Sequence, residues 1–210
     1  MVGIIDYGLG NPISIQNMLK RVNQDSIITS DLKILEDLSS YILPGVGNFK
    51  FGMHNLEKLG LKEFIQLEVK KSKKPLLGIC LGMQLLLNNS EEGNVEGLGL
   101  IDGRVVAFKR EINDNLLIPH MGWNFVEYSE YSEKINGNCN DGSCEEERYY
   151  FVHSYHAANV EPCNIVATTK YGYNFPTIIK NGNFYGVQFH PEKSHKFGVN
   201  FFKSYFASAQ

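Results

Sequence analysis

The sequence predicts an α/β fold: a single domain with a mostly parallel central sheet flanked by helices, and a β-rich second half. In the first ninety or so residues, short apolar runs alternate with segments of helical periodicity, as strands and crossover helices do in a parallel sheet. After Gly93, short strand-like runs are separated by Gly, Asn and Asp. A length of 210 residues can bury one compact core, so we expect one domain over residues 1–210.

The first half predicts strands that alternate with helices. Ile15, Met18, Leu19 and Val22 recur at offsets 0, 3, 4 and 7, the spacing of one helical face. The strands are short apolar runs, and Pro and Gly follow the second of them. We expect buried strands over residues 2–7, 41–43 and 75–79, with helices over residues 14–22, around 55–72 and over 83–87.

The second half predicts strands and one final helix. Phe197, Phe201 and Tyr205 recur every four residues, which indicates a helix over residues 197–206 that docks through its aromatic side. The polar stretch 127–148 is expected to be a surface excursion. We expect strands over residues 104–108, 149–152, 165–169 and 183–189.

Composition excludes several classes of protein. Hydrophobic residues make up 43%, charged residues 20%, and the net charge is -3, so neither a disordered chain nor a nucleic-acid partner is expected. No run reaches the length of a membrane span. Four cysteines are too few and too unevenly spaced for a disulfide framework, which favours the reducing cytoplasm. Cys139 and Cys144 supply only two ligands for a metal, so we expect no metal and no cofactor.

Cys80 is the candidate nucleophile. The sequence Gly78-Ile79-Cys80-Leu81-Gly82 lies where a strand gives way to a helix, the arrangement of a nucleophile elbow. The helix N-terminus would favour the thiolate. The alternative is a buried core cysteine, the commoner fate of this residue type.

His190 is the candidate base, and Glu192 is its candidate partner. Residues two apart in an extended chain point to the same side, so Glu192 can orient the imidazole. The alternative is a surface ion pair. His54, His156 and His195 are expected to be ordinary surface or partly packed histidines.

The turn Pro44-Gly45-Val46-Gly47 follows a buried strand at the same edge of the predicted sheet. Glycines there allow backbone N–H groups to turn inward and bind an oxyanion. On local grounds a simple tight turn is the better interpretation.

Taken together, these segments resemble the class I (triad) glutamine amidotransferases. Within that family the chain is most similar to the HisH-type glutaminase subunits of imidazole glycerol phosphate synthase, through the stretches Pro-His-Met-Gly-Trp and Phe-Val-His-Ser-Tyr. The matching residues are 4–11, 43–47, 78–86, 97–100, 119–124, 150–155 and 188–194.

The resemblance implies a flavodoxin-like sheet and the hydrolysis of L-glutamine to glutamate and ammonia. Cys80, His190 and Glu192 would form the catalytic triad. Leu81 and the peptide region of Val46 and Gly47 would form the oxyanion hole. Residues matching the family's glutamine pocket are Gly47, Gly82, Gln84, His153, Ser154 and Tyr155.

The resemblance also implies a protein partner, a (βα)8-barrel cyclase. That subunit uses the ammonia to make imidazole glycerol phosphate and a carboxamide ribonucleotide in histidine biosynthesis. Two alternatives remain open: the same chemistry serving a surface-sugar amidotransferase, and a non-catalytic regulatory homologue. A lone tryptophan suits an interface hot spot and a core position equally. The family's docking-face positions correspond to Asn11, Pro119, Met121, Trp123 and Lys193.

Overall fold

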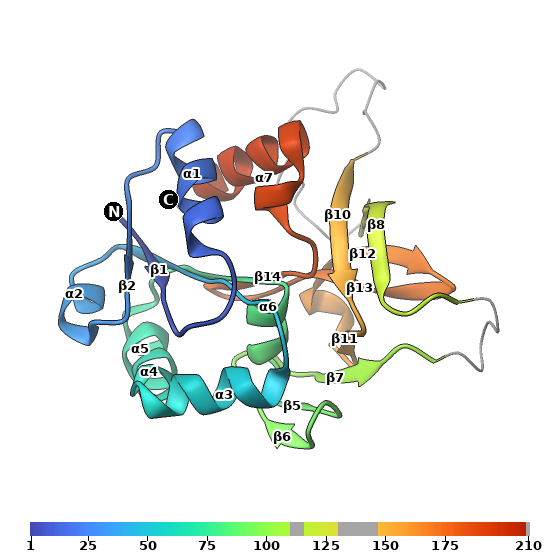
Figure 1. The fold of residues 1–210 in the computed structure, drawn as a ribbon, viewed down its shortest axis with the longest axis horizontal. Coiled ribbons are helices and arrows are strands. Elements are labelled where there is room, and N and C mark those ends of the chain that lie inside the picture. The colour runs from blue at the N-terminus through green and yellow to red at the C-terminus, as the bar shows by residue number, and fades with distance from the viewer. Residues whose placement is uncertain (110–115, 130–146, 209–210) are drawn as a thin grey trace.

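The computed structural model describes residues 1–109, 116–129 and 147–208, and its centre is an eight-stranded mixed sheet (Figure 1). Five parallel strands lie in the order β2-β1-β3-β4-β14, the 2-1-3-4-5 order of flavodoxin-like folds. Three antiparallel strands, β13, β12 and β9, extend the sheet beyond β14. The strands are β1 (Val2–Ile5), β2 (Ser26–Thr29), β3 (Ser40–Leu43), β4 (Leu76–Ile79), β9 (Glu127–Tyr128), β12 (Ile165–Tyr171), β13 (Tyr173–Asn181) and β14 (Phe184–Val187).

Helices cover both faces of the parallel part (Figure 1). Helices α1 (Pro12–Arg21) and α7 (His195–Ser208) pack together on one face. The other face carries α2 (Leu32–Glu36), α3 (Phe49–Lys58), α4 (Leu61–Glu63), the π-helical turn Phe64–Val69, α5 (Lys70–Ser72) and α6 (Leu81–Leu85). None of the helices in these described ranges has the length and apolar character needed to cross a bilayer.

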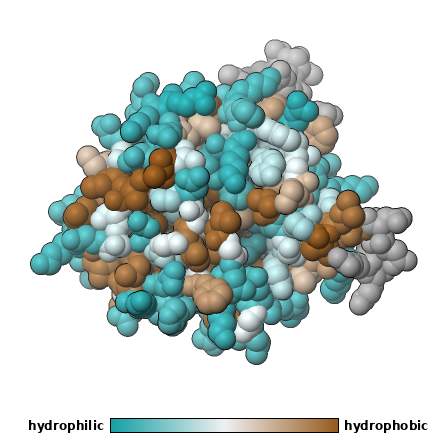
Figure 2. Space-filling view, in the orientation of Figure 1, coloured by the Kyte–Doolittle hydropathy of each residue, from teal (hydrophilic) through white to brown (hydrophobic). Residues whose placement is uncertain are grey.

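Two hydrophobic cores result, one on each face of the sheet. The neighbouring residues Ile4 and Ile5 of β1 are fully buried in different cores, because successive strand side chains point to opposite faces. This is why the parallel strands read as continuous apolar runs in the sequence. On the outer surface, apolar residues form several groups among hydrophilic ones (Figure 2).

The predicted fold class is confirmed. The stretch expected to be one helix around residues 55–72 is helical, but its helix starts earlier and is interrupted at residues 59 and 60. Helix α3 begins earlier, because the Asn48 side chain accepts a hydrogen bond from the Phe51 N–H and caps it. The helix then ends at Lys58, and two residues later Gly60 adopts a left-handed φ of 69°. The apolar periodicity continues through this break, so spacing alone did not reveal it.

The second half forms two further small sheets. One is the antiparallel pair of β8 (His120–Phe125) and β10 (Arg148–His153), and the other has the order β11-β7-β5-β6. Strand β8 was not expected. Its exposure alternates from a buried His120 to an exposed Met121 and Trp123, so it has one inner and one outer side. The remaining strands are β5 (Asn89–Ser90), β6 (Val95–Glu96), β7 (Arg104–Ala107) and β11 (Tyr155–Ala158).

Part of the expected surface excursion lies outside the described residues. Its first residues form β9 and its last begins β10, whereas Cys139 and Cys144 fall within 130–146.

Candidate active site

Cys80 lies at the sharp turn between β4 and α6. Its φ of 54° and ψ of -108° are strained for a residue with a side chain. A Cβ on Gly78 would lie 2.6 Å from the Gly82 carbonyl, and a Cβ on Gly82 would collide with the carbonyl oxygen of Leu43. The two glycines therefore permit the turn that exposes the sulfur at the carboxyl edge of the sheet.

His190 and Glu192 follow β14 at the same edge. Nδ1 of His190 lies 2.7 Å from Oε1 of Glu192, and their side chains are only 1% and 3% exposed. The pair is therefore buried, and the alternative of a surface ion pair is wrong. The other ring nitrogen, Nε2, is buried without a hydrogen bond to another described residue.

The charge state of His190 depends on its two neighbours. Burial lowers its pKa, but negative charge on the Cys80 sulfur and on Glu192 outweighs burial and raises the pKa to about 10. The sulfur is close enough to affect the ring, although not at regular hydrogen-bond geometry. This arrangement favours a protonated His190 at neutral pH when the neighbouring sulfur is negatively charged.

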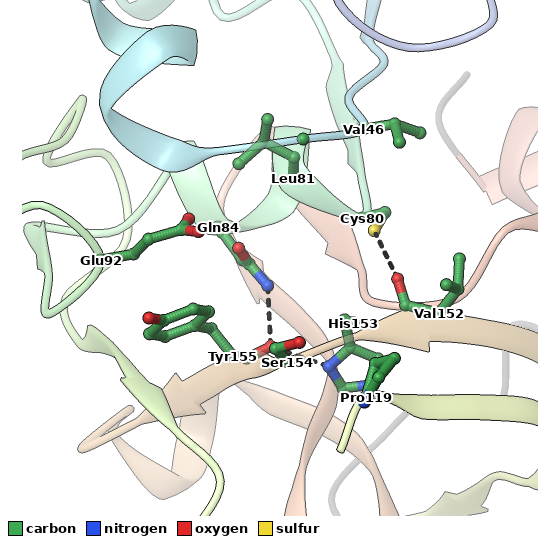
Figure 3. A pocket seen from close by; sticks show the side chains of 11 residues that line it. Val46, Cys80, Leu81, Gln84, Glu92, Pro119, Val152, His153, Ser154 and Tyr155 are labelled. Atoms are coloured by element: carbon green, nitrogen blue, oxygen red, sulfur yellow. Dashed lines mark hydrogen bonds between the residues drawn. The ribbon is translucent and has the colours of Figure 1, made fainter.

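A cavity of about 230 Å³ opens above the Cys80 sulfur (Figure 3). The turn that contains Val46 and Gly47 lies at the mouth of the cavity, where Val46 is 45% exposed. The φ of Gly47 is 119°, a backbone conformation that favours glycine. Leu81 is the first residue of α6, so its N–H has no hydrogen-bond partner within that helix. The lining residues are Val46, Gly47, Cys80, Leu81, Gln84, Glu92, Pro119, Val152, His153, Ser154 and Tyr155.

For two residues, the lining of the cavity differs from what the resemblance implies. Gly82 does not line the cavity, because it packs against Leu43 at the end of β3. Pro119, expected on the docking face, is exposed and also lines the cavity.

Three residues near the sulfur were not singled out from the sequence. Glu92 lines the cavity, and its Oε2 accepts a hydrogen bond from the Phe49 N–H at 2.7 Å. The Val152 carbonyl oxygen lies 4.0 Å from the Cys80 sulfur, and Nε2 of Gln188 lies 3.7 Å from it. Gln188 could have been found, because it precedes His190 by two residues. Glu92 lies in a polar turn after β5 and gives no local signal.

Gln84 is held inside the cavity wall by its amide nitrogen. Nε2 donates to the Tyr155 carbonyl at 2.9 Å (Figure 3). It also donates to Oε1 of Gln188 at 3.0 Å. Both of its hydrogens are used, so only the carbonyl oxygen remains for a ligand.

Two buried histidines lie beside the cavity. Nδ1 of His120 is 3.0 Å from Nε2 of His153, whose Nδ1 is 2.7 Å from the Tyr155 carbonyl oxygen. Burial lowers the pKa of His120 to about 4 and that of His153 well below its usual value. Both rings are therefore neutral at physiological pH.

His156 differs from its expected setting. His156 is buried, with Nε2 2.8 Å from the Tyr173 hydroxyl, so it is not a surface histidine. Cys163 is exposed. Within the described ranges, no three His, Cys, Asp or Glu residues gather to hold a metal ion.

The expected docking-face residues are all exposed. Trp123 is 44% exposed and Met121 61%, so the alternative of a core tryptophan is wrong. The ring of His195 stacks on Trp123 at 5.6 Å, and the Lys193 ammonium lies 5.9 Å from the Tyr150 ring centre. Asn11 and Pro119 are likewise exposed.

The sequence matches the family described as glutamine amidotransferase class-I over residues 4–207. It is 46% identical to imidazole glycerol phosphate synthase subunit HisH 2 of Methanococcus maripaludis across the whole of both chains. It is 42% identical to the subunit HisH 2 of Pseudomonas aeruginosa across 98% of each chain. A solved glutamine amidotransferase superposes with a TM-score of 0.74 at 16% identity, covering 99% of this chain and 98% of that one.

Proposed function

The chain belongs to the class-I glutamine amidotransferases, and we propose that it hydrolyses L-glutamine as the glutaminase subunit of an imidazole glycerol phosphate synthase. One observation carries the proposal. A cysteine in a strained turn opens into a small cavity, and a buried His190–Glu192 pair lies close enough for the sulfur to raise the pKa of His190. This is the arrangement that nucleophilic acyl transfer requires.

In the first half of the reaction, the Cys80 sulfur attacks the side-chain amide carbon of glutamine. The resulting oxyanion is stabilised by the Leu81 N–H and by an N–H of the Val46–Gly47 region. His190 gives its proton to the departing nitrogen, the carbon–nitrogen bond breaks, and ammonia leaves a glutamyl thioester.

In the second half, water attacks the thioester. His190 takes a proton from that water and the carbon–sulfur bond breaks. Glutamate is released and the Cys80 thiolate is regenerated. Glu192 accepts from Nδ1–H throughout and so fixes the ring and stabilises its protonated form.

The cavity wall supplies groups that suit the amino-acid end of glutamine. The Glu92 carboxylate matches the substrate's ammonium group, and the free carbonyl oxygen of Gln84 can accept another N–H. Ser154 and Tyr155 line the cavity next to Gln84 (Figure 3). They provide a hydroxyl and backbone groups for the substrate carboxylate.

The test of the triad is glutamate release by Cys80→Ala, with Cys163→Ser as the matched control. The Cys163 thiol is exposed and away from the cavity, so its removal should leave the rate unchanged. We expect Cys80→Ala to lose at least roughly a thousandfold in kcat. Unchanged glutamate release in Cys80→Ala would exclude the triad.

We further propose that the ammonia passes to a (βα)8-barrel cyclase docked over Asn11, Pro119, Met121, Trp123 and Lys193. An exposed tryptophan and methionine beside a lysine fit the apolar centre and charged rim of a protein interface. Pro119 both faces outward and lines the cavity, so a partner seated there adjoins the site of ammonia release.

The partner is tested by purifying the chain from its own cells and identifying the protein that accompanies it. Recovery of a barrel cyclase supports histidine biosynthesis. Recovery of a surface-sugar amidotransferase would replace that partner and leave the glutaminase chemistry intact. Because the Val46–Gly47 turn is exposed at the cavity mouth, we expect glutaminase activity to rise when the cyclase and its nucleotide substrate are added.

A further inference from the structure

A continuous chain of hydrogen bonds connects strand β8 to the Cys80 sulfur. It begins at Asn124, whose Nδ2 is 3.1 Å from Nε2 of His120. It passes from His120 to His153 and then to the Tyr155 carbonyl oxygen. From there Gln84 and Gln188 complete the path to the sulfur.

The direction of every donor in this chain is fixed by its ends. Oδ1 of Asn124 accepts from the Phe125 N–H at 2.8 Å and Nδ2 also donates to the Lys170 carbonyl at 3.1 Å, so Nδ2 must face His120. Nε2 of His120 is therefore an acceptor, which places its proton on Nδ1 and makes Nε2 of His153 an acceptor. The proton of His153 then lies on Nδ1 and is donated to Tyr155.

The far end is fixed in the same way. The Tyr155 carbonyl can only accept, so Gln84 presents its Nε2 to it and to Oε1 of Gln188. Gln188 must then direct its own Nε2 at the Cys80 sulfur. All of these side chains except Asn124 are buried, so water offers little competition for their hydrogen bonds.

We propose that Gln188 is a positioning residue that donates a hydrogen bond to the Cys80 thiolate and that Gln84 holds it in that orientation. Gln84 is oriented by the Tyr155 carbonyl, and His153, His120 and Asn124 hold that carbonyl in place. The proposal rests on Cys80 being the nucleophile. A hydrogen bond to the charged form of an acid favours that form, so this donor stabilises the thiolate alongside His190. Tyr7, a further titratable group near the sulfur, donates its hydroxyl to the Pro44 carbonyl and is not available for this role.

The chain starts on the inner side of the strand whose outer side carries the docking residues. His120 and Asn124 alternate along β8 with Met121 and Trp123. The carbonyl that orients Gln84 and Gln188 is therefore tied, through His153 and His120, to the strand that we propose contacts the partner.

The test is the pH dependence of Cys80 alkylation by iodoacetamide, followed by mass spectrometry of the peptide that contains Cys80. Gln188→Met keeps the volume of the side chain and removes the donor. In this variant we expect the acidic limb of the alkylation profile to move up by about one pH unit. This shift corresponds to roughly tenfold less thiolate at a given pH on that limb. Thr169→Val is the control, because the buried Thr169 hydroxyl makes no hydrogen bond to another described residue.

Two substitutions of His120 distinguish its role as a hydrogen-bond donor from its role in aromatic packing. His120→Phe keeps an aromatic ring between Phe151 and Tyr171 but removes the Nδ1 donor, whereas His120→Asn loses the stacking and keeps a donor near that position. We expect His120→Phe to move the limb up by about half a unit and His120→Asn to leave it near wild type. A purely structural role predicts the opposite order.

An unchanged profile in Gln188→Met, or equal profiles in the two His120 variants, would overturn the proposal. Either result would leave the glutaminase assignment intact as long as Cys80→Ala is inactive. Activity retained in Cys80→Ala would instead remove the proposed function itself.

Discussion

The neutral, buried His120 should make the protein lose stability in mild acid. Its pKa is lowered by burial from 6.5 to about 4, so the folded state binds fewer protons than the unfolded state between these values. The free energy of unfolding therefore falls as the pH falls through this window. At pH 5 this group alone costs about 2 kcal/mol relative to pH 7.5, and below pH 4 the cost approaches about 3 kcal/mol.

The assay is urea unfolding of wild type and His120→Phe at pH 7.5 and pH 5, monitored by circular dichroism. The variant cannot take up a proton at this position and retains the aromatic stack on Phe151 and Tyr171. Contributions from other groups are largely shared and cancel in the comparison. We expect wild type to lose about 2 kcal/mol more than the variant between the two pH values.

A parallel loss of stability in the two proteins would refute this reasoning. It would mean that His120 titrates near its ordinary pKa in the folded state. The hydrogen-bond directions assigned from Asn124 to Tyr155 would then hold only above that pKa, because a protonated His120 donates from both nitrogens.

Three further changes have defined outcomes. Glu192→Gln should lower the pKa of His190, since one of the charges that raise it is removed, and reduce kcat by roughly a hundredfold or more, measured by glutamate release across pH. Gly82→Ala places a Cβ against the Leu43 carbonyl and should cost roughly 3 kcal/mol or more in urea unfolding; a wild-type midpoint would contradict the close approach. Trp123→Ala should weaken cyclase binding by roughly thirtyfold in calorimetry while the unfolding of the isolated chain changes little, and undiminished affinity would place the docking surface elsewhere.

Much of the active site could be predicted from local sequence. The strained turn at Cys80 follows from glycines two residues before and two after it, and the pairing of His190 with Glu192 follows from their spacing of two. These features depend on backbone geometry within a few residues. Spacing could not decide whether the His190–Glu192 pair was buried, because burial depends on what packs over it.

The sequence by itself determined the parallel arrangement of the first half, the elbow and the identity of the candidate triad, because each is encoded in short-range periodicity and turn chemistry. Only the tertiary structure decided which distant groups surround the sulfur. Gln84 meets Gln188 across 104 positions of sequence, and His120 meets His153 across 33. Glu92 reaches the cavity from a turn with no distinguishing pattern. Such contacts arise where separate strands end at one edge of the sheet, and their hydrogen bonds become selective only when folding excludes water from that edge.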